Sequence, residues 1–408
     1  MKFEPETVKG FQDFLSPESV KRKQVKKIIE NFFELYGFIP IETPIVEYDE
    51  LMMPDSIDSN EDEAVSDRFR LQDRAGRNLG LRYEFTFQLQ RIFKQNPNLK
   101  LPFKRYQIGP VFRDEPISSN RFRQFVQCDA DIIGSSSVDS DVECLSLISD
   151  ITTALGIEAE IEINNRKLLA SIIESVQIPN PSKVIKEIDK FEKIGEDEVK
   201  ANLRKFTTPN QIVTLLKLLE KPFSFFLENA FDGAEELKKT IDQAKLYKIK
   251  LKFNPYLARG LGYYTGNIFE VKVQGSKNTI AAGGRYDNSV GKFLNREIPA
   301  VGISFGLERI TQLAKLSVPK PVKALIISID EPEDSISLTK KLRKSNIPCV
   351  LTFGQVSKQL EYANSQEIPY VIFIGSEEIS SKKFKLKDML SGEEKLLNGK
   401  QLISKLSK

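Results

Sequence analysis

The sequence contains no histidine among its 408 residues. This absence excludes histidine general bases, Ser-His-Asp triads and histidine-ligated zinc. The three cysteines, Cys128, Cys144 and Cys349, are widely spaced and form no CxxC pair, so we expect neither a structural zinc site nor a disulfide framework. Any chemistry must therefore depend on arginine, carboxylates, tyrosine, amides and bound metal ions, and a reducing cytoplasm is the expected compartment.

Long apolar runs and a strong net charge are also lacking. No run reaches the length of a membrane span, and Met1-Lys2-Phe3-Glu4 does not resemble a signal peptide, so we expect no membrane partner. Sixty basic residues against 57 acidic ones give a charge of +3, which permits a nucleic-acid partner without demanding one. The length of the chain predicts two or three domains.

Changes in the sequence pattern divide the chain into three parts. Residues 1–166 and 248–318 mix helical and strand patterns, and we expect them to form one domain. Residues 167–247 show Lys/Glu-rich helical periodicity, which predicts a helical insertion. A linker is predicted at Pro319-Lys320-Pro321. Beyond it, short apolar strands alternate with helices through residues 322–408, as in a small α/β domain.

The N-terminal segment predicts a surface for self-association. A helix is expected over residues 16–36, because Ser-Pro-Glu-Ser is a start signal and apolar positions follow at helical spacing. A strand is expected over residues 38–46. Pro44 within it favours an edge or interface strand, since proline cannot donate to the ladder. An edge strand beside an amphipathic helix predicts a homodimer.

The stretch with the most chemical information is residues 103–134, in which two β-type runs flank an arginine- and acid-rich turn. We expect an antiparallel hairpin whose paired strands project Arg113, Glu115, Arg121, Arg123 and Gln127. Arginines and carboxylates on one rigid face suit an anionic ligand, because a guanidinium matches phosphate and carboxylate oxygens bidentately. A solvated strand face with surface ion pairs explains these residues equally well on their own.

Three further segments place glycines beside arginines. In LARGLGYYTG, glycine permits close backbone approach to a ligand, and Tyr263 and Tyr264 are expected on opposite faces of a strand beside Arg259. AAGGRYD predicts a turn into an exposed Arg285. PAVGISFGLERI predicts a strand, a glycine and a helix start carrying Arg309, a junction whose N–H groups can face an anion. An ordinary structural role remains open for each arginine.

Taken together, these segments resemble the class II aminoacyl-tRNA synthetases, and specifically the histidyl-tRNA synthetase family along nearly the whole chain. Glu42-Thr43-Pro44 resembles the first class motif, YQIGPVFRDE…RFRQFVQCDADIIG the second and PAVGISFGLERI the third. LARGLGYYTG with AAGGRYD is specific to the family and its paralogues, and residues 355–375 resemble its anticodon-binding domain. The resemblance implies an α+β catalytic domain on an antiparallel sheet, a helical insertion and a C-terminal α/β anticodon-binding domain.

The resemblance also implies an activity: ATP-dependent activation of L-histidine to histidyl-adenylate and transfer to the 3′ end of tRNA-His. ATP is then a substrate and Mg²⁺ its counterion, with protein ligands that the sequence does not identify. Arg113 and Arg259 are implied as catalytic cations at the α-phosphate. The implied ATP-binding residues are Arg113, Glu115, Arg121, Phe125 and Arg309.

The same match assigns the amino-acid site. Glu84 and Thr86, in LRYEFT, would bind the α-ammonium group together with Gln127, whereas Asp131 and Tyr264 would read the imidazole ring. Buried polar readout of this kind rejects analogues that lack the matching groups. The implied histidine-binding residues are Glu84, Thr86, Arg113, Gln127, Asp131, Arg259, Tyr263 and Tyr264. Gly262 departs from the family pattern, which usually has an acidic residue there.

Two alternatives belong to other functional classes. One is the catalytically silent, synthetase-like regulatory subunit of ATP phosphoribosyltransferase, which generally lacks the C-terminal α/β domain and tends to lose the signature residues. The other is a tRNA-binding pseudo-synthetase that acts as a sensor. Retention of Arg113, Arg259 and Arg309 together argues against the sensor.

Overall fold

The predicted hairpin is present as β5 (Phe103–Phe112) and β6 (Gln124–Ile133), which pair antiparallel over their whole length. The structure differs from the prediction in one respect. Arg113, Glu115 and Arg121 lie in the connection between the two strands, and of the projecting residues only Gln127 lies on a strand. The backbone N–H of Arg113 donates to the carbonyl of Arg123 at 2.8 Å, so the connection begins and ends beside the last strand pair.

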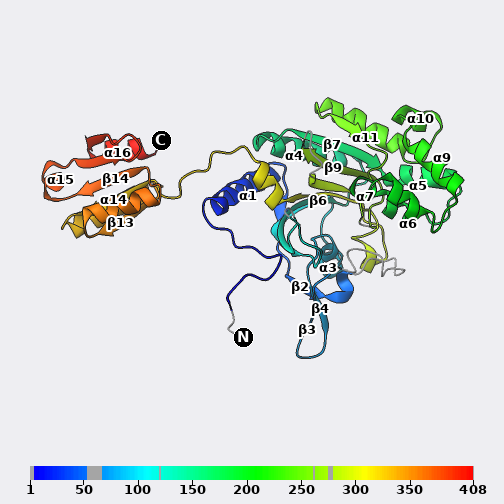
Figure 1. The fold of residues 1–408 in the computed structure, drawn as a ribbon, viewed down its shortest axis with the longest axis horizontal. Helices are drawn as coiled ribbons and strands as arrows, with labels where there is room; N and C mark the ends of the chain where they lie inside the picture. Colours follow the sequence, from blue (N-terminus) through cyan, green and yellow to red (C-terminus); the bar gives the residue numbers. More distant parts are fainter. Residues whose placement is uncertain (1–3, 53–66, 119–120, 261, 274–278, 408) are drawn as a thin grey trace. The chain divides into compact units, whose positions relative to one another are not determined.

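The computed structural model describes residues 4–52, 67–118, 121–260, 262–273 and 279–407 (Figure 1). The chain forms two units, Met1–Leu316 and Ser317–Lys408. Their boundary falls just before the predicted linker at Pro319-Lys320-Pro321.

The first unit is built on an eight-stranded sheet. Besides β5 and β6, its strands are β1 (Ile39–Pro40), β7 (Ala159–Asn165), β8 (Leu251–Phe253), β9 (Asn267–Val273), β10 (Thr279–Arg285) and β11 (Ala300–Gly306). The order is β1-β5-β6-β11-β10-β9-β7-β8. Pairs from β5 to β7 are antiparallel, whereas β1–β5 and β7–β8 are parallel. The antiparallel sheet is therefore confirmed, and β1 is an edge strand, although Pro44 lies outside it.

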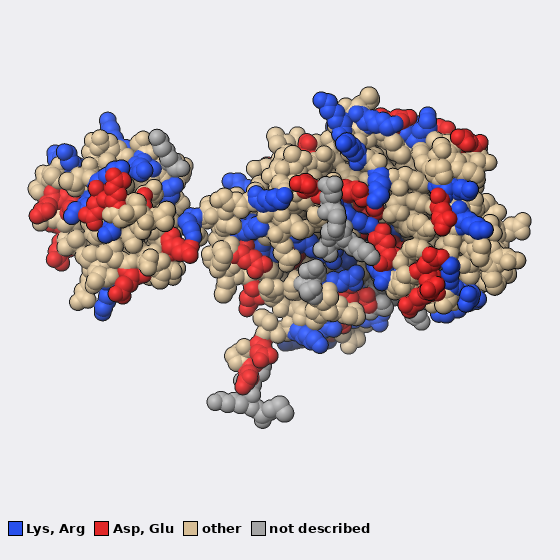
Figure 2. All heavy atoms as spheres, turned by 45° about the horizontal axis from the view of Figure 1, so that its top comes forward, with Lys and Arg blue, Asp and Glu red and all other residues tan. Residues whose placement is uncertain are grey.

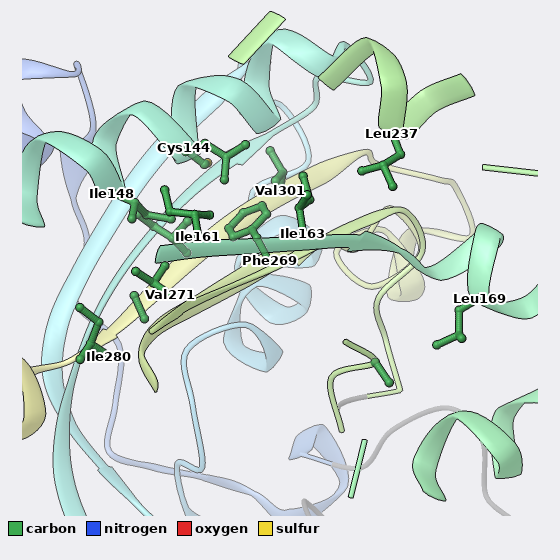
Figure 3. Packing of buried hydrophobic residues seen from close by; sticks show 14 of the residues in the cluster. Cys144, Ile148, Ile161, Ile163, Leu169, Leu237, Phe269, Val271, Ile280 and Val301 are labelled. Carbon is green, nitrogen blue, oxygen red and sulfur yellow. The ribbon is translucent and has the colours of Figure 1, made fainter. Parts of the chain in front are cut away.

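One face of this sheet is covered by helices α1 (Glu18–Leu35), α4 (Val138–Ala154) and α12 (Leu307–Leu313). Helix α1 buries Val25, Ile29 and Phe33, a spacing of four residues that places them on one stripe. Figure 3 shows how α4 packs: its side chains point at the apolar residues of β7, β9 and β11, and the labelled ones are Cys144, Ile148, Ile161, Ile163, Phe269, Val271 and Val301. The main core therefore lies between the helices and this face.

The segment predicted to be a helical insertion consists of helices. They are α5 (Arg166–Ser175), α6 (Pro181–Ile188), α7 (Phe191–Ile194), α8 (Glu196–Leu203), α9 (Pro209–Leu219), α10 (Phe223–Glu228) and α11 (Ala234–Leu246) (Figure 1). Their buried side chains join the same hydrophobic cluster as the sheet, and α11 packs against α4. Because the cluster is shared, the domain boundaries at residues 166/167 and 247/248 stay a proposal.

A small sheet and a helix complete the first unit. The sheet has the order β2-β4-β3, with β2 (Val46–Tyr48), β3 (Arg70–Gln72) and β4 (Asn78–Leu81). Short 3-10 helices lie at Asp49–Met52 and Lys292–Leu294. Helix α3 (Phe87–Gln95) follows β4. No helix was predicted at this position from the sequence, so α3 was missed.

The second unit is a five-stranded sheet with the order β13-β12-β14-β15-β16. Its elements are β12 (Ala324–Ser328), α13 (Pro332–Lys344), β13 (Cys349–Phe353), α14 (Val356–Ser365), β14 (Tyr370–Ile374), α15 (Ser376–Ser381), β15 (Phe384–Asp388), β16 (Glu394–Leu397) and α16 (Gly399–Leu406). β12, β13 and β14 are parallel, which confirms the predicted βαβ pattern. Alternate residues of β12 enter two clusters, Ile326 in one and Leu325 and Ile327 in the other, so both faces are covered.

Candidate active site

A cavity of about 330 Å³ lies in the first unit and is walled by strands, connecting segments and helix ends. Its walls come from the connection before α3, the connection between β5 and β6, strand β6, the loop before β9, strands β9 to β11, and the start of α12. The helical insertion adds Asp189, just after α6, and Lys193 in α7. The residues that the resemblance implies for substrate binding all line it: Glu84, Thr86, Arg113, Glu115, Arg121, Phe125, Gln127, Asp131, Arg259, Tyr263, Tyr264 and Arg309. Arg123 and Arg285 do not. Segments far apart in the chain are thus brought to one place.

Strand β6 separates the cavity from the core by simple alternation. Gln127, Asp129 and Asp131 line the cavity, whereas Cys128 and Ala130 are fully buried in the main cluster. Side chains in a strand point alternately to opposite faces, so β6 contributes side chains to both the cavity and the hydrophobic core. The motif match did not assign Asp129. The alternation in QCDAD is the signal that would have found it.

Asp131 is held by two buried neighbours. Arg105, on β5, places Nη2 at 2.7 Å from Asp131 Oδ2, and both side chains are almost completely buried. The hydroxyl of Tyr286 donates to Asp131 Oδ1. Burial raises the pKa of Asp131, and the Arg105 charge opposes this rise. Neither Arg105 nor Tyr286 was identified from the sequence, although Tyr286 stands inside the AAGGRYD segment.

Glu84 marks the start of helix α3. Its carboxylate accepts the backbone N–H of Thr86 at 2.7 Å and that of Phe87 at 2.7 Å. These are donors that have no partner within the helix. Burial raises the pKa of Glu84, and these hydrogen bonds oppose the rise. The LRYEFT segment therefore presents Glu84 and Thr86 on a backbone that the carboxylate itself fixes.

Arg113 is held between aromatic rings. The guanidinium carbon lies 4.3 Å from the ring centroid of Tyr83 and 5.0 Å from that of Phe125. Nε also donates to the carbonyl of Tyr83 at 3.4 Å. Cation–π contacts of this kind orient an arginine without occupying its donors with a carboxylate. Phe125, which the motif match assigns to adenine, thus contacts Arg113 in this structure.

Two more arginines stand beside Arg113. Arg121 pairs with Glu115 at 3.0 Å, and Arg309, in the first turn of α12, donates to the carbonyl of Thr279 at 2.9 Å. Burial lowers the pKa of Arg309, and the nearby charges of Arg121 and Arg113 lower it further. Cations that repel one another across a cavity favour an anion between them.

Arg259 adopts a strained backbone conformation. Its φ is 61°, in the left-handed region that non-glycine residues rarely occupy. Its Nη1 lies 3.6 Å from Glu270 Oε1, and its Nε is buried without a hydrogen-bond partner. Burial acts to lower the pKa of Arg259, but Tyr264 and Glu270 outweigh it and raise the pKa. The guanidinium is therefore charged and incompletely paired.

Tyr263 and Tyr264 lie in the loop that precedes β9 and not on a strand. Their ring centroids are 4.8 Å apart, and both side chains line the cavity. The prediction that they occupy opposite faces of a strand was wrong. The loop backbone turns the second ring to the same side as the first.

Arg285 is buried, and the prediction of an exposed arginine was wrong. β10 continues through Arg285, and the side chain reaches Asp141 on α4. It also donates to the carbonyls of Ser135 and Ser137, each at 2.9 Å. Asn267 donates to the same Asp141 carboxylate at 3.2 Å. Arg285 therefore connects the sheet to the helix layer and does not line the cavity.

Two of the cavity carboxylates, Glu270 and Glu308, are bound to protein donors. Glu270 accepts the hydroxyl of Thr279 at 2.5 Å, and Glu308 accepts the guanidinium of Arg22 at 2.9 Å and the N–H of Val126 at 3.1 Å. Among the described residues, no group of three or more acidic, cysteine or histidine side chains could hold a metal ion. A preformed protein metal site therefore does not fit this part of the chain.

Comparison with known proteins agrees with this geometry. A family model described as histidyl-tRNA synthetase matches residues 10–310, and one described as an anticodon binding domain matches residues 323–408. Histidine–tRNA ligase 1 of Bacillus cereus is 38% identical over 418 residues, which span 96% of this chain and 94% of that protein. The histidine–tRNA ligase of Helicobacter acinonychis is 34% identical, over 95% of this chain and 94% of its own.

Solved structures have the same fold. The crystal structure of histidyl-tRNA synthetase from Nostoc sp. PCC 7120 matches with a TM-score of 0.85 and 29% identity, over 100% of this chain and 99% of that one. The family model covers most of the first unit, and the relatives extend over both units. The chain therefore belongs to the histidyl-tRNA synthetase family.

Proposed function

We propose that this chain is a histidine–tRNA ligase, which activates L-histidine with ATP to histidyl-adenylate and transfers it to the 3′ end of tRNA-His. The observation that carries the proposal is the convergence of arginines, carboxylates and tyrosines from separate motifs on one cavity. Relatives named histidine–tRNA ligase that match along almost the whole chain support it.

Activation joins two anions, the histidine carboxylate and the α-phosphate of ATP, so negative charge increases in the transition state. We propose Arg113 and Arg259 as the catalytic cations. Arg113 is held between aromatic rings before substrate binds, and Arg259 lies beside Glu270 on a backbone of unusual conformation. Preorganised cations stabilise developing charge without reorganisation, which is usually the largest catalytic contribution.

The remaining ATP contacts follow from the same cluster. Arg121 and Arg309 are proposed to bind the outer phosphates, with Arg309 acting as the γ-phosphate contact. Glu115 and Phe125 are proposed to meet adenine. Mg²⁺ would enter with ATP and supply charge compensation at the phosphates, since magnesium is usually held by substrate phosphates and only one or two carboxylates.

The amino acid is proposed to lie along β6. Glu84, Thr86 and Gln127 would bind the α-ammonium group, and Asp131 and Tyr264 the imidazole ring. The rigid support of Asp131 by Arg105 and Tyr286 suits this role, because a fixed carboxylate discriminates among ring nitrogens. Tyr263 is proposed to pack beside Tyr264 as part of the same wall.

The division of labour along the chain is part of the proposal. Residues 1–166 and 248–318 would form the catalytic domain, residues 167–247 an insertion, and residues 322–408 the reader of the tRNA anticodon. The match of residues 323–408 to an anticodon binding domain supports the last assignment. On the face shown in Figure 2, basic and acidic side chains are interspersed on each unit. On this face, tRNA would therefore be bound by small groups of basic side chains and not by one broad basic surface.

The small sheet and β1 support a homodimer. Exposed apolar side chains are found on β1, β2, β3 and the connection between the first two: Ile39, Ile45, Val46, Tyr48 and Leu71. Exposed apolar surface is a feature of interaction sites, and most soluble oligomers are symmetric. Light scattering at micromolar concentration should report twice the mass of one chain. A monomer at that concentration contradicts the proposal.

We also propose a cytoplasmic location. Cys128, Cys144 and Cys349 are all free and buried thiols, as expected in a reducing compartment. Within the described part of the chain, no helix combines the length and the apolar content that a membrane crossing requires.

The alternative function, a regulatory subunit of ATP phosphoribosyltransferase, is represented by one solved structure of the same fold. A Bacillus halodurans C protein described as an ATP phosphoribosyltransferase regulatory subunit/histidyl-tRNA synthetase matches with a TM-score of 0.77. It is 20% identical, so the likeness is one of fold. The anticodon-type domain at residues 323–408 favours the ligase.

The test is histidine-dependent exchange between ATP and pyrophosphate, followed by charging of tRNA-His, on the purified full chain. We expect exchange with L-histidine and background rates with other amino acids. A folded protein that shows no exchange with histidine overturns the proposed ligase and favours the regulatory alternative.

A further inference from the structure

The cavity contains a carboxyl group to which no role is assigned above. Asp129 lines the cavity and is only 5% exposed, and its Oδ1 is buried without a hydrogen-bond partner. It stands on β6 between Gln127 and Asp131. Because a buried polar atom without a partner is costly, the open acceptor calls for a ligand or a proton.

The charged groups that act on Asp129 lie on β5, on β6 and before α3. Arg105, on β5, is the nearby cation, and Asp131 on β6 and Glu84 before α3 are nearby anions. Ser304, on the adjacent strand β11, is a hydrogen-bond partner of the same carboxyl. One buried guanidinium thus faces three carboxyl groups, and an added cation would reduce the excess of negative charge.

The other two carboxyl groups have protein partners, although Glu84 keeps lone pairs for the α-ammonium role proposed above. Both oxygens of Glu84 accept backbone N–H groups at the start of α3. Asp131 is bound by the Tyr286 hydroxyl and by Arg105. Oδ2 of Asp131 and Oδ1 of Asp129 both lack a hydrogen-bond partner, but Asp131 Oδ2 faces the Arg105 guanidinium at 2.7 Å, whereas no ion pair is found for Asp129 among the described residues.

We propose that Asp129 binds the α-ammonium group of the amino acid through Oδ1, beside Gln127. The inference rests on the proposed function, because it concerns the amino acid that the ligase activates. An ammonium group has three N–H donors, and a carboxylate is the acceptor that both receives a hydrogen bond and compensates the charge.

Proton release is a consequence of this binding mode. Burial raises the pKa of Asp129 to about 8; Arg105 opposes the rise, and Asp131 and Glu84 add to it. In the empty cavity at neutral pH the carboxyl group is therefore mostly protonated. An ammonium ion favours the ionised form, so the proton passes to the solvent when histidine binds. Histidine affinity should then rise with pH, by up to about tenfold per unit below pH 8.

The decisive variant is Asp129→Asn, which keeps the shape and removes the charge. Two ligands are compared by calorimetry: L-histidine, and imidazolepropionate, which lacks the ammonium group. We expect histidine to bind roughly 10- to 100-fold more weakly, the range for losing one charged hydrogen bond, with the affinity for imidazolepropionate and the KM for ATP unchanged. Asp242→Asn, which changes a half-exposed carboxylate on α11, is the control and should bind both ligands as the parent does.

Several results would overturn the inference. Unchanged histidine affinity in Asp129→Asn would do so, and so would equal losses for histidine and imidazolepropionate, which indicate a structural role. If Asp129→Asn does not fold, the unmodified enzyme decides: calorimetry in two buffers of different ionisation heat should detect close to one proton released below pH 8, and no release contradicts the inference. Absence of histidine-dependent exchange in the unmodified enzyme would instead remove the proposed function itself.

Discussion

Two arginines, Arg285 and Arg259, come from neighbouring glycine-rich segments but are paired in opposite ways. Arg285 is buried and bound by Asp141, Asp287 and two backbone carbonyls. Arg259 has a buried Nε without a partner and lies 3.6 Å from its nearest carboxylate oxygen, on Glu270. A saturated arginine holds structure, whereas an unsaturated one beside a cavity retains binding capacity for a ligand. Residue type and glycine context did not distinguish the two.

The largest effect is expected from breaking the saturated arginine. Arg285→Leu leaves Asp141 buried without its cation, and loss of one partner of a buried pair costs about 3–5 kcal/mol of unfolding free energy. Denaturant unfolding measures this loss. Replacing both residues, with Arg285→Met and Asp141→Leu, should cost less than the sum of the two single changes. If Arg285→Leu has normal stability but has lost histidine activation, Arg285 has a functional role and the structural assignment is wrong.

Arg259 should behave in the opposite way. Arg259→Ala should fold and still bind histidine and ATP, while adenylate formation loses roughly 2.7–4 kcal/mol of transition-state stabilisation. Arg259→Lys should recover only part, because an ammonium cannot make the planar bidentate contact. Single-turnover kinetics and melting are measured on the same preparations.

A control separates the side chain of Arg259 from its backbone. Because φ is 61°, Arg259→Gly should be more stable than Arg259→Ala, yet both should be equally slow. Near-normal activation together with a lowered melting temperature would defeat the catalytic assignment and reopen the regulatory alternative.

The smallest structural effect is expected at Arg121. Its pair with Glu115 is partly exposed, with 45% of the Arg121 side chain accessible, and exposed pairs contribute about 0–1 kcal/mol. Arg121→Ala should therefore melt normally and raise the KM for ATP several-fold. Steady-state exchange at varied ATP measures this. Glu115→Gln serves as the matched change in the partner residue. A large loss of stability in either variant would mean that the pair has a structural role, as Arg285 does.

Sequence reasoning predicted features that depend on local pattern. The helix at α1, the β5–β6 hairpin, the junction of β11 with α12, and the parallel βαβ pattern of the second unit all follow from apolar spacing and glycine positions. It failed where a distant residue decides. The burial of Arg285 was not predicted, since its partner Asp141 lies 144 positions away in the chain. The pairing of Arg105 with Asp131 on the neighbouring strand was missed for the same reason: the sequence does not show which side chains meet.

Local signals also failed where they are unusual. Thr86 stands at the N-cap of helix α3, but its side chain makes no capping hydrogen bond. The carboxylate of Glu84 instead accepts the N–H groups of Thr86 and Phe87, so the usual N-cap preference does not describe this helix start. The chemical roles at the site could be predicted because the residues of each motif are close together in the sequence. The contacts of Arg105 and Tyr286 with Asp131 could not be predicted in this way.

The alternation of β6 has a consequence for how this strand tolerates insertions and deletions. In a strand with a cavity on one side and a core on the other, side chains alternate between the two with a period of two residues. A shift of one residue therefore exchanges the two sets of side chains. Loss of one residue near Gln124 would turn Cys128 and Ala130 toward the cavity and force Asp129 and Asp131 into the apolar cluster. We expect single substitutions on the cavity side to fold, whereas a one-residue deletion within β6 should destroy activity and core together.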